Sequence, residues 1–175
     1  MTIKTIFLDR DGVINKDINY LHKIKDFQFI DGTFEACKYL CNLDYKIIII
    51  TNQSGIGRGF YTESDFKILT NWMVSQFMEN NIEILDVFHC PHSPNSNCNC
   101  RKPKPGLIFK AKEMYKINLE KSWMIGDSER DILAANSAGI FNTALVRTGH
   151  PFDELTTAAK YVINSIHQSQ DIILD

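Results

Sequence analysis

Short apolar runs alternate along the chain with amphipathic helical patterns, and this alternation restricts the possible folds more than any other feature. The run Ile47–Ile50 is entirely β-branched, which suits a strand that helices cover on both faces. Strand patterns cover Ile3–Leu8, Lys46–Thr51, Ile84–His89, Ser122–Gly126, Thr143–Val146 and Tyr161–Ile163. Because helical patterns separate most of these strands, we predict an α/β fold with a mostly parallel central sheet.

The helical patterns place apolar residues at the spacing that turns one face toward a core. They cover Asp31–Leu43, Thr62–Asn80, Pro105–Tyr115, Glu129–Ala138 and a short final helix near Ile166–Ile172. Thr62 is the expected N-cap of the second helix, and Gly139 is the expected C-terminal cap of the fourth. Met78 and Met114 are among the residues predicted to face inward. We predict loops at 15–29 and 51–59.

Length and composition indicate a single soluble unit. A chain of 175 residues is long enough for one domain with a real core, which we expect to span residues 1–175. Its formal net charge of -2 gives no reason to expect nucleic acid as a partner. The longest apolar run is too short to span a bilayer, and the N-terminus has no signal-peptide pattern. We therefore expect a cytoplasmic protein with no membrane partner and, without an obvious dimerisation stripe, a monomer.

Polar residues follow four successive strand patterns, in the pairs Asp9 and Asp11, Thr51 and Asn52, Arg101 and Lys102, and Asp127 and Asp131. The carboxyl ends of parallel strands form the ligand-binding edge of such a sheet. Carboxylates from two strands, Asp9 and Asp127, can hold a hard cation such as Mg²⁺. Basic side chains and the hydroxyl of Thr51 suit a phosphate. Each pair alone is explained equally well by turn formation, helix capping or a solvated surface, so the prediction depends on their joint occurrence.

A second candidate site lies at 90–100, where the possible ligands are Cys90, His92, Cys98 and Cys100. Three thiolates and one imidazole make a closed tetrahedral zinc site, which is structural because no position remains for water. The odd total of five cysteines favours metal binding over a disulfide framework. Free thiols, an isolated disulfide, or His89 in place of His92 are the alternatives. Zinc bound here would hold Arg101 and Lys102 beside the last ligand.

Taken in order, these residues resemble the haloacid dehalogenase-like (HAD) phosphohydrolases over nearly the whole chain. Asp9-Arg10-Asp11-Gly12 is similar to the family's nucleophile motif, and Thr51-Asn52 is similar to its phosphate-binding motif. Lys102 resembles the family's lysine, and Gly126-Asp127 resembles its metal motif. The resemblance implies a Rossmann-like three-layer fold, and the short segments between motifs leave no room for a large cap domain.

The resemblance also implies a role for each motif. Asp9 would be the nucleophile that forms an aspartyl-phosphate, and Asp11 would be the general acid and base. Mg²⁺ would be held by Asp9, the backbone carbonyl of Asp11 and Asp127, while Thr51 and Lys102 would stabilise the transferred phosphoryl group. Independently of the resemblance, the place of Asp131 one turn beyond Asp127 makes it a supporting partner of the metal ligands.

Two groups within this family are most similar to the chain, the D-glycero-D-manno-heptose 1,7-bisphosphate 7-phosphatases and the histidinol-phosphate phosphatases. The segment 51–61 resembles the heptose enzymes, whereas the short spacer Ser93–Asn97 resembles the histidinol type. Ser128 departs from the heptose pattern, in which a lysine often stands at this position. The resemblance implies a substrate site formed by Asp17, Asn19, Tyr20, Thr51, Asn52, Gln53, Ser54, Arg58, Arg101 and Lys102.

The leading hypothesis is therefore a Mg²⁺-dependent phosphatase that removes the 7-phosphate of a heptose 1,7-bisphosphate, in the synthesis of nucleotide-activated heptose for lipopolysaccharide or another glycan. Hydrolysis of histidinol phosphate is the first alternative. A phosphatase with broad or protein substrates is the second, because a site without a cap is open. A phosphorylation-responsive binding module is an alternative of another class, since receiver domains also cluster Asp, Thr and Lys on a doubly wound sheet.

Overall fold

The computed structural model describes residues 2–174, which form one six-stranded sheet with helices on both faces. Neighbouring strands are all parallel and follow the order β3-β2-β1-β4-β5-β6. The strands are β1 (Thr5–Leu8), β2 (Lys46–Asn52), β3 (Ile84–Cys90), β4 (Trp123–Gly126), β5 (Asn142–Val146) and β6 (Tyr161–Ile163). The predicted α/β class and the parallel sheet are thus confirmed, with strand bounds that differ by a residue or two.

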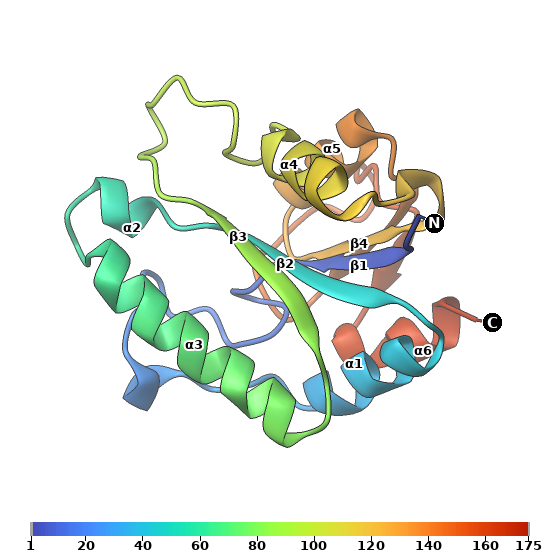
Figure 1. The fold of residues 1–175 in the computed structure, drawn as a ribbon. Helices are drawn as coiled ribbons and strands as arrows, with labels where there is room; N and C mark the ends of the chain where they lie inside the picture. The colour runs from blue at the N-terminus through green and yellow to red at the C-terminus, as the bar shows by residue number, and fades with distance from the viewer. Residues whose placement is uncertain (1, 175) are drawn as a thin grey trace.

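The helices form the two outer layers of the molecule (Figure 1). One face of the sheet carries α1 (Thr33–Asn42), α3 (Glu63–Glu79) and α6 (Ser169–Ile172). The other face carries α4 (Gly106–Tyr115) and α5 (Glu129–Ala138). Within residues 2–174, the remaining helical segments are short: α2 (Ser54–Gly57), η1 (Ile24–Asp26), η2 (Leu119–Lys121) and η3 (Ile166–Gln168). No segment between the strands in this range forms a cap domain.

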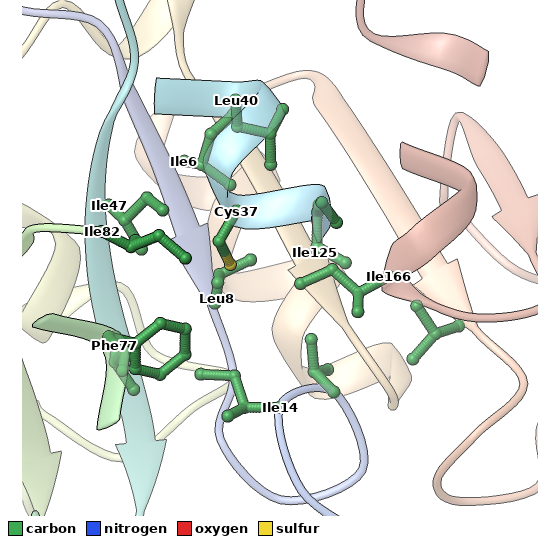
Figure 2. Packing of buried hydrophobic residues seen from close by; sticks show 14 of the residues in the cluster. Ile6, Leu8, Ile14, Cys37, Leu40, Ile47, Phe77, Ile82, Ile125 and Ile166 are labelled. Atoms are coloured by element: carbon green, nitrogen blue, oxygen red, sulfur yellow. The ribbon is translucent and has the colours of Figure 1, made fainter. Parts of the chain in front are cut away.

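Side chains of β1 alternate between the two layers, as the pleat of a strand requires. Ile6 and Leu8 pack toward α1 against Cys37 and Leu40, as Figure 2 shows, whereas Phe7 lies in the core beneath α4 and α5. Each of these side chains is fully buried. Burial of one such residue contributes about 1.5–3 kcal/mol, so β1 stabilises both layers of the fold.

Two helices begin with reciprocal hydrogen bonds between the N-cap residue and the third helical residue. At α3 the Thr62 hydroxyl accepts from the amide of Asp65, and the Asp65 carboxylate accepts from the amide of Thr62. At α5 the Asp131 carboxylate accepts from the amide and the hydroxyl of Ser128, the Asp131 amide donates to the Ser128 carbonyl, and the helix ends at Gly139 with a φ of 94°. These caps satisfy amides that have no partner within the helix. The predicted N-cap at Thr62 and C-terminal cap at Gly139 are confirmed.

Four details of the predicted elements are wrong. Met78 and Met114 are exposed, at 71% and 55%: Met78 lies beside the buried face of α3, which ends at Phe77, and Met114 lies in the last turn of α4, beyond Ala111, its last buried residue. Residues 51–59, which were predicted to form a loop, contain the single helical turn α2. The last predicted helix is divided into η3 and α6.

The topology brings distant parts of the chain together at one edge of the sheet. Strand order reverses between β1 and β4, and the crevice outside the carboxyl ends at such a reversal is where ligands bind in doubly wound sheets. Asp9 follows β1 and Asp127 follows β4, so the two carboxylates lie on either side of this crevice. Among the described residues, no helix is long and apolar enough to cross a membrane.

Candidate active site

A pocket of about 300 Å³ opens at the carboxyl ends of the strands. Its lining includes every residue that the sequence predicts for catalysis, magnesium or substrate: Asp9, Asp11, Asp17, Asn19, Tyr20, Thr51, Asn52, Gln53, Ser54, Arg58, Arg101, Lys102 and Asp127. Asp131 and Ser128 also line the pocket. Residues from the segments that follow β1, β2, β3 and β4 therefore share one concave surface, as the parallel topology requires.

Lys102 is the buried cation at the floor of this pocket, with only 3% of its surface exposed. Its Nζ lies 3.0 Å from Asp9 Oδ1 and 2.6 Å from Asp131 Oδ1, and it donates a hydrogen bond of 2.8 Å to the Ile50 carbonyl. Burial acts to lower the pKa of Lys102, but the two carboxylates outweigh it and raise the pKa above its usual value. Lys102 is therefore held as an ammonium directly beside Asp9.

Asp9, Asp127 and Asp131 bring three carboxylates close together, with one oxygen of each within 4.8 Å of the others. Burial raises the pKa of Asp9 well above its usual value, against the opposing charge of Lys102, and the neighbouring carboxylates raise it further. Burial also raises the pKa of Asp127, and the nearby charge of Asp131 raises it further. A single lysine cannot balance this much buried negative charge. The cluster therefore suits a divalent cation that takes oxygen ligands.

Asp11 is held in place by side chains that surround its carboxylate. Arg10 donates to both oxygens with Nη2, at 3.0 Å each, while Asn15 and Gln53 donate at 2.9 and 3.1 Å. Arg10 itself is 1% exposed and also donates to the Leu21 carbonyl at 3.1 Å. Sequence reasoning did not assign a role to Arg10 or Asn15. An arginine between two aspartates at the end of a buried strand was the available signal.

Asn52 and Thr51 support neighbouring residues as well as the pocket. Asn52 exchanges two hydrogen bonds of 3.1 Å with the backbone of Lys102, which joins the end of β2 to the segment after the cysteines. Thr51 accepts from Gln53 at 2.8 Å, and the hydroxyl of Tyr61 donates to Gln53. The end of β2 is thus a hydrogen-bonded platform under the pocket.

The segment after β1 and the segment after β2 meet above the pocket. Tyr20 packs edge-on against Phe60 at 4.7 Å between ring centroids, and the guanidinium of Arg58 lies 5.9 Å from the Tyr20 ring. Asn19 and Tyr20 have φ angles of 57° and 54°. This left-handed backbone conformation is unfavourable for residues other than glycine. Such backbone persists where surrounding contacts hold it, and here it turns Tyr20 toward the pocket wall.

His150 is the site residue that sequence reasoning missed most clearly. It lines the pocket from the segment after β5, and its Nδ1 lies 2.6 Å from Asp127 Oδ2. No local pattern marks it, because its partner is far away in the sequence. Ser128, the expected departure from the heptose pattern, caps α5 and donates from its hydroxyl to Asp131 at 3.1 Å.

The four predicted zinc ligands form a separate cluster that extends from the end of β3. One atom each of Cys90, His92, Cys98 and Cys100 lies within 4.8 Å of the other three. The closest pairs are Cys90 Sγ and Cys100 Sγ at 3.0 Å, and His92 Nδ1 and Cys100 Sγ at 3.2 Å, while Cys98 Sγ lies 3.7 Å from Cys90 Sγ. His89 lies outside the cluster and contacts Glu63 at 2.9 Å. The cysteines are not joined by disulfides, so the donor set and its convergence fit zinc.

Comparison with known proteins agrees with this geometry. A family model described as HAD-hydrolase-like matches residues 99–169. The chain is 48% identical to the D-glycero-alpha-D-manno-heptose-1,7-bisphosphate 7-phosphatase of Photorhabdus laumondii, over 90% of each chain. It is 42% identical to the D-glycero-beta-D-manno-heptose-1,7-bisphosphate 7-phosphatase of Vibrio cholerae, over 99% of this chain and 98% of that one.

A solved structure gives the same answer for the fold. The D,D-heptose 1,7-bisphosphate phosphatase from B. bronchiseptica, crystallised with magnesium and phosphate, superposes with a TM-score of 0.84 and 30% identity, over 97% of each chain. The fold, the pocket and the relatives agree on a phosphoric monoester hydrolase. The chain therefore belongs to the D-glycero-D-manno-heptose 1,7-bisphosphate 7-phosphatase family of the HAD-like phosphatases.

Proposed function

We propose that this enzyme hydrolyses the 7-phosphate of a D-glycero-D-manno-heptose 1,7-bisphosphate, with Mg²⁺ as cofactor and an aspartyl-phosphate as intermediate. The observation that supports this most strongly is the contact of 3.0 Å between Asp9 and the buried ammonium of Lys102, beside Asp127 and Asp131. A carboxylate in such surroundings can attack phosphorus while the charge of the phosphoryl group is balanced.

The reaction would have two displacements at phosphorus. A carboxylate oxygen of Asp9 attacks the 7-phosphate, the bond to the sugar oxygen breaks, and Asp11 donates a proton to that oxygen as it leaves. Asp11 then accepts a proton from a water molecule, which attacks the phosphorus of the aspartyl-phosphate. This step releases inorganic phosphate and restores the Asp9 carboxylate.

The residues present fit a magnesium ion. Asp9 and Asp127 would supply carboxylate ligands and Asp11 its backbone carbonyl, with Asp131 close enough to support them. Bound Mg²⁺ would neutralise the charge on the phosphoryl oxygens. Thr51, 1% exposed at the end of β2, and Lys102 would stabilise the same group from the protein side.

The rest of the substrate would be held by the rim of the pocket. Arg101 Nη1 is buried without a hydrogen-bond partner among the described residues, and a second phosphate or a sugar hydroxyl would satisfy it. Arg58 also lines the pocket, beside Tyr20. The remaining predicted contacts are Asp17, Asn19, Asn52, Gln53 and Ser54.

Zinc bound by Cys90, His92, Cys98 and Cys100 would have a structural role. Arg101 and Lys102 directly follow the last ligand, and the segment between the ligands contains few apolar residues that could order it by packing. A closed site with four protein ligands would hold this segment without taking part in the chemistry.

We further infer that the whole chain acts as one phosphatase domain, as a monomer in the cytoplasm. Its product, a heptose 1-phosphate, suits the synthesis of nucleotide-activated heptose for lipopolysaccharide or another glycan. The relatives' names support the heptose phosphate product, while the single domain, the monomer and the location are inferred from the sequence.

Phosphate release in the presence of Mg²⁺ tests the proposal. The substrates are the 1α and 1β anomers of heptose 1,7-bisphosphate and histidinol phosphate, with the Asp9→Asn variant as control. We expect a large preference for one or both heptose anomers and a loss of activity of at least about a thousandfold in Asp9→Asn, because the amide is not a nucleophile. Preference for histidinol phosphate would overturn the substrate assignment, and substantial activity of Asp9→Asn would overturn the mechanism.

A further inference from the structure

Beyond the predicted motifs, the segment Arg147–Pro151 packs directly against the metal-binding edge of the pocket. The hydroxyl of Thr148 donates to the Gly12 carbonyl at 2.7 Å, and the amide of His150 donates to Asp127 Oδ2 at 2.9 Å. At Gly149 a side chain would collide with the carboxylate of Asp127. The segment after β5 therefore has the close contact with Asp127 that only a glycine at this position permits.

The side chain of His150 adds a second hydrogen bond to the same carboxylate oxygen. Because Asp127 Oδ2 is an acceptor, the Nδ1 that lies 2.6 Å away is the protonated nitrogen of the ring. Asp127 Oδ2 thus accepts from both the backbone and the side chain of one residue. No hydrogen bond from the described residues reaches Asp127 Oδ1, which leaves that oxygen available for a ligand.

The other ring nitrogen of His150 faces the segment after β1. Its Nε2 lies 3.7 Å from Asp17 Oδ2, while Asp17 Oδ1 accepts from the amide of Asn19 at 2.9 Å. One imidazole therefore connects the segments that follow β1, β4 and β5. It is 45% exposed, so packing contributes little to its position; the hydrogen bond to Asp127 holds the ring, and Asp17 is its second polar neighbour.

We propose that His150 is a positioning residue, which fixes the orientation of the Asp127 carboxylate for the divalent cation and links it to the substrate segment through Asp17. The proposal rests on the role of Asp127 as a metal ligand in the proposed function. Residues that orient metal ligands by hydrogen bonding alter metal affinity by about ten- to a hundredfold when they are removed. His150 does not contact the reacting atoms, so its effect should appear first in metal binding.

Two conservative variants separate the two contacts. In His150→Asn, the side-chain amide can occupy the place of Nδ1 and keep the bond to Asp127, but it is too short to reach Asp17. In His150→Gln, the amide occupies the place of Nε2 and loses the bond to Asp127. His150→Ala removes both contacts, and His167→Ala, which alters a histidine of η3 outside the pocket, is the matched control.

The experiment measures Mn²⁺ binding calorimetrically, in zinc-loaded protein without substrate, and KM for the preferred heptose bisphosphate. We expect His150→Ala and His150→Gln to weaken Mn²⁺ binding about tenfold or more. His150→Asn and His167→Ala should bind Mn²⁺ as wild type does, and His150→Asn should show a raised KM. Thermal unfolding of each variant shows whether it is folded.

Wild-type Mn²⁺ affinity in a folded His150→Ala variant would overturn the inference. Equal loss in His150→Asn and His150→Ala would also overturn it, because the bond to Asp127 would then not explain the effect. The outcome is independent of the substrate assignment: if wild type hydrolyses no heptose bisphosphate while Mn²⁺ binding changes as expected, the proposed function fails and the role of His150 stands.

Discussion

At the scale of single residues, the site depends on charges that are buried only because each has a partner. Arg10 is the clearest case, because its guanidinium is buried and donates hydrogen bonds to both carboxylate oxygens of Asp11. The planar guanidinium fixes the direction of the carboxylate as well as its charge. The proposed acid and base is therefore held in one orientation by a neighbouring buried arginine.

Replacing Arg10 with Met should destabilise the protein strongly, because Asp11 would keep a largely buried charge without its partner. We expect the free energy of unfolding to fall by about 3 kcal/mol, measured by urea denaturation. Arg147→Met is the matched control, because the ion pair of Arg147 with Glu154 is solvent-exposed and its loss should leave stability nearly unchanged. Equal effects of the two substitutions would contradict this account of Arg10.

At the scale of elements, the cysteine segment is a loop whose order depends on four ligands from positions 90–100. Figure 1 shows this segment extending away from the sheet between β3 and α4. Its two ends are tied to the body of the protein, because the amide of Gln53 donates to the Cys90 carbonyl at 2.8 Å and Asn52 binds the backbone of Lys102. Its middle is held chiefly by the contacts within the thiol and imidazole cluster.

Cys98→Ser should therefore lose most of its bound zinc, as measured by atomic absorption on the purified protein. Activity should fall with it, because Arg101 and Lys102 would no longer be held at the pocket. Cys41→Ser is the control, since Cys41 lies on α1 outside the cluster. Full zinc retention in Cys98→Ser would refute the zinc assignment.

The start of α3 offers a test of stability that is separate from the site. Thr62→Ala removes the hydroxyl that accepts from the amide of Asp65 and should lower the free energy of unfolding by about 1 kcal/mol.

Hydrogen bonds from the backbone and side chain of Thr62 lower the pKa of Asp65 below its usual value. Stabilisation by the ionised carboxylate is thus present above the unfolded pKa and lost as pH falls through the folded pKa.

The pH dependence of this cap follows from that direction. Wild type should be more stable than Asp65→Asn near neutral pH, and the difference should shrink below about pH 4, where the carboxyl of an unfolded aspartate becomes protonated. Chemical denaturation at several pH values measures it. A difference that is constant from neutral to acid pH would show that the charge of Asp65 does not stabilise the helix.

At the scale of the whole molecule, the sequence predicts the framework well because local patterns determine it. The apolar runs indicate strands, the parallel topology follows from the helices between them, and the carboxyl ends must then meet at one edge. That is why residues as distant as Asp9 and Asp127 could be assigned to one site. The residues that were missed differ in this respect: His150 is recognisable only through Asp127, whereas Arg10 stands between two aspartates but its role becomes clear only from its burial and its contact with Asp11.

Determining which phosphate is removed tests the central claim most directly. Purified protein with Mg²⁺ would be given each anomer of heptose 1,7-bisphosphate, and the remaining sugar phosphate would be identified by phosphorus and proton NMR. The account predicts a heptose 1-phosphate from at least one anomer, with the phosphorus at carbon 1 retained. A heptose 7-phosphate as the product, or no turnover of either anomer, would contradict it.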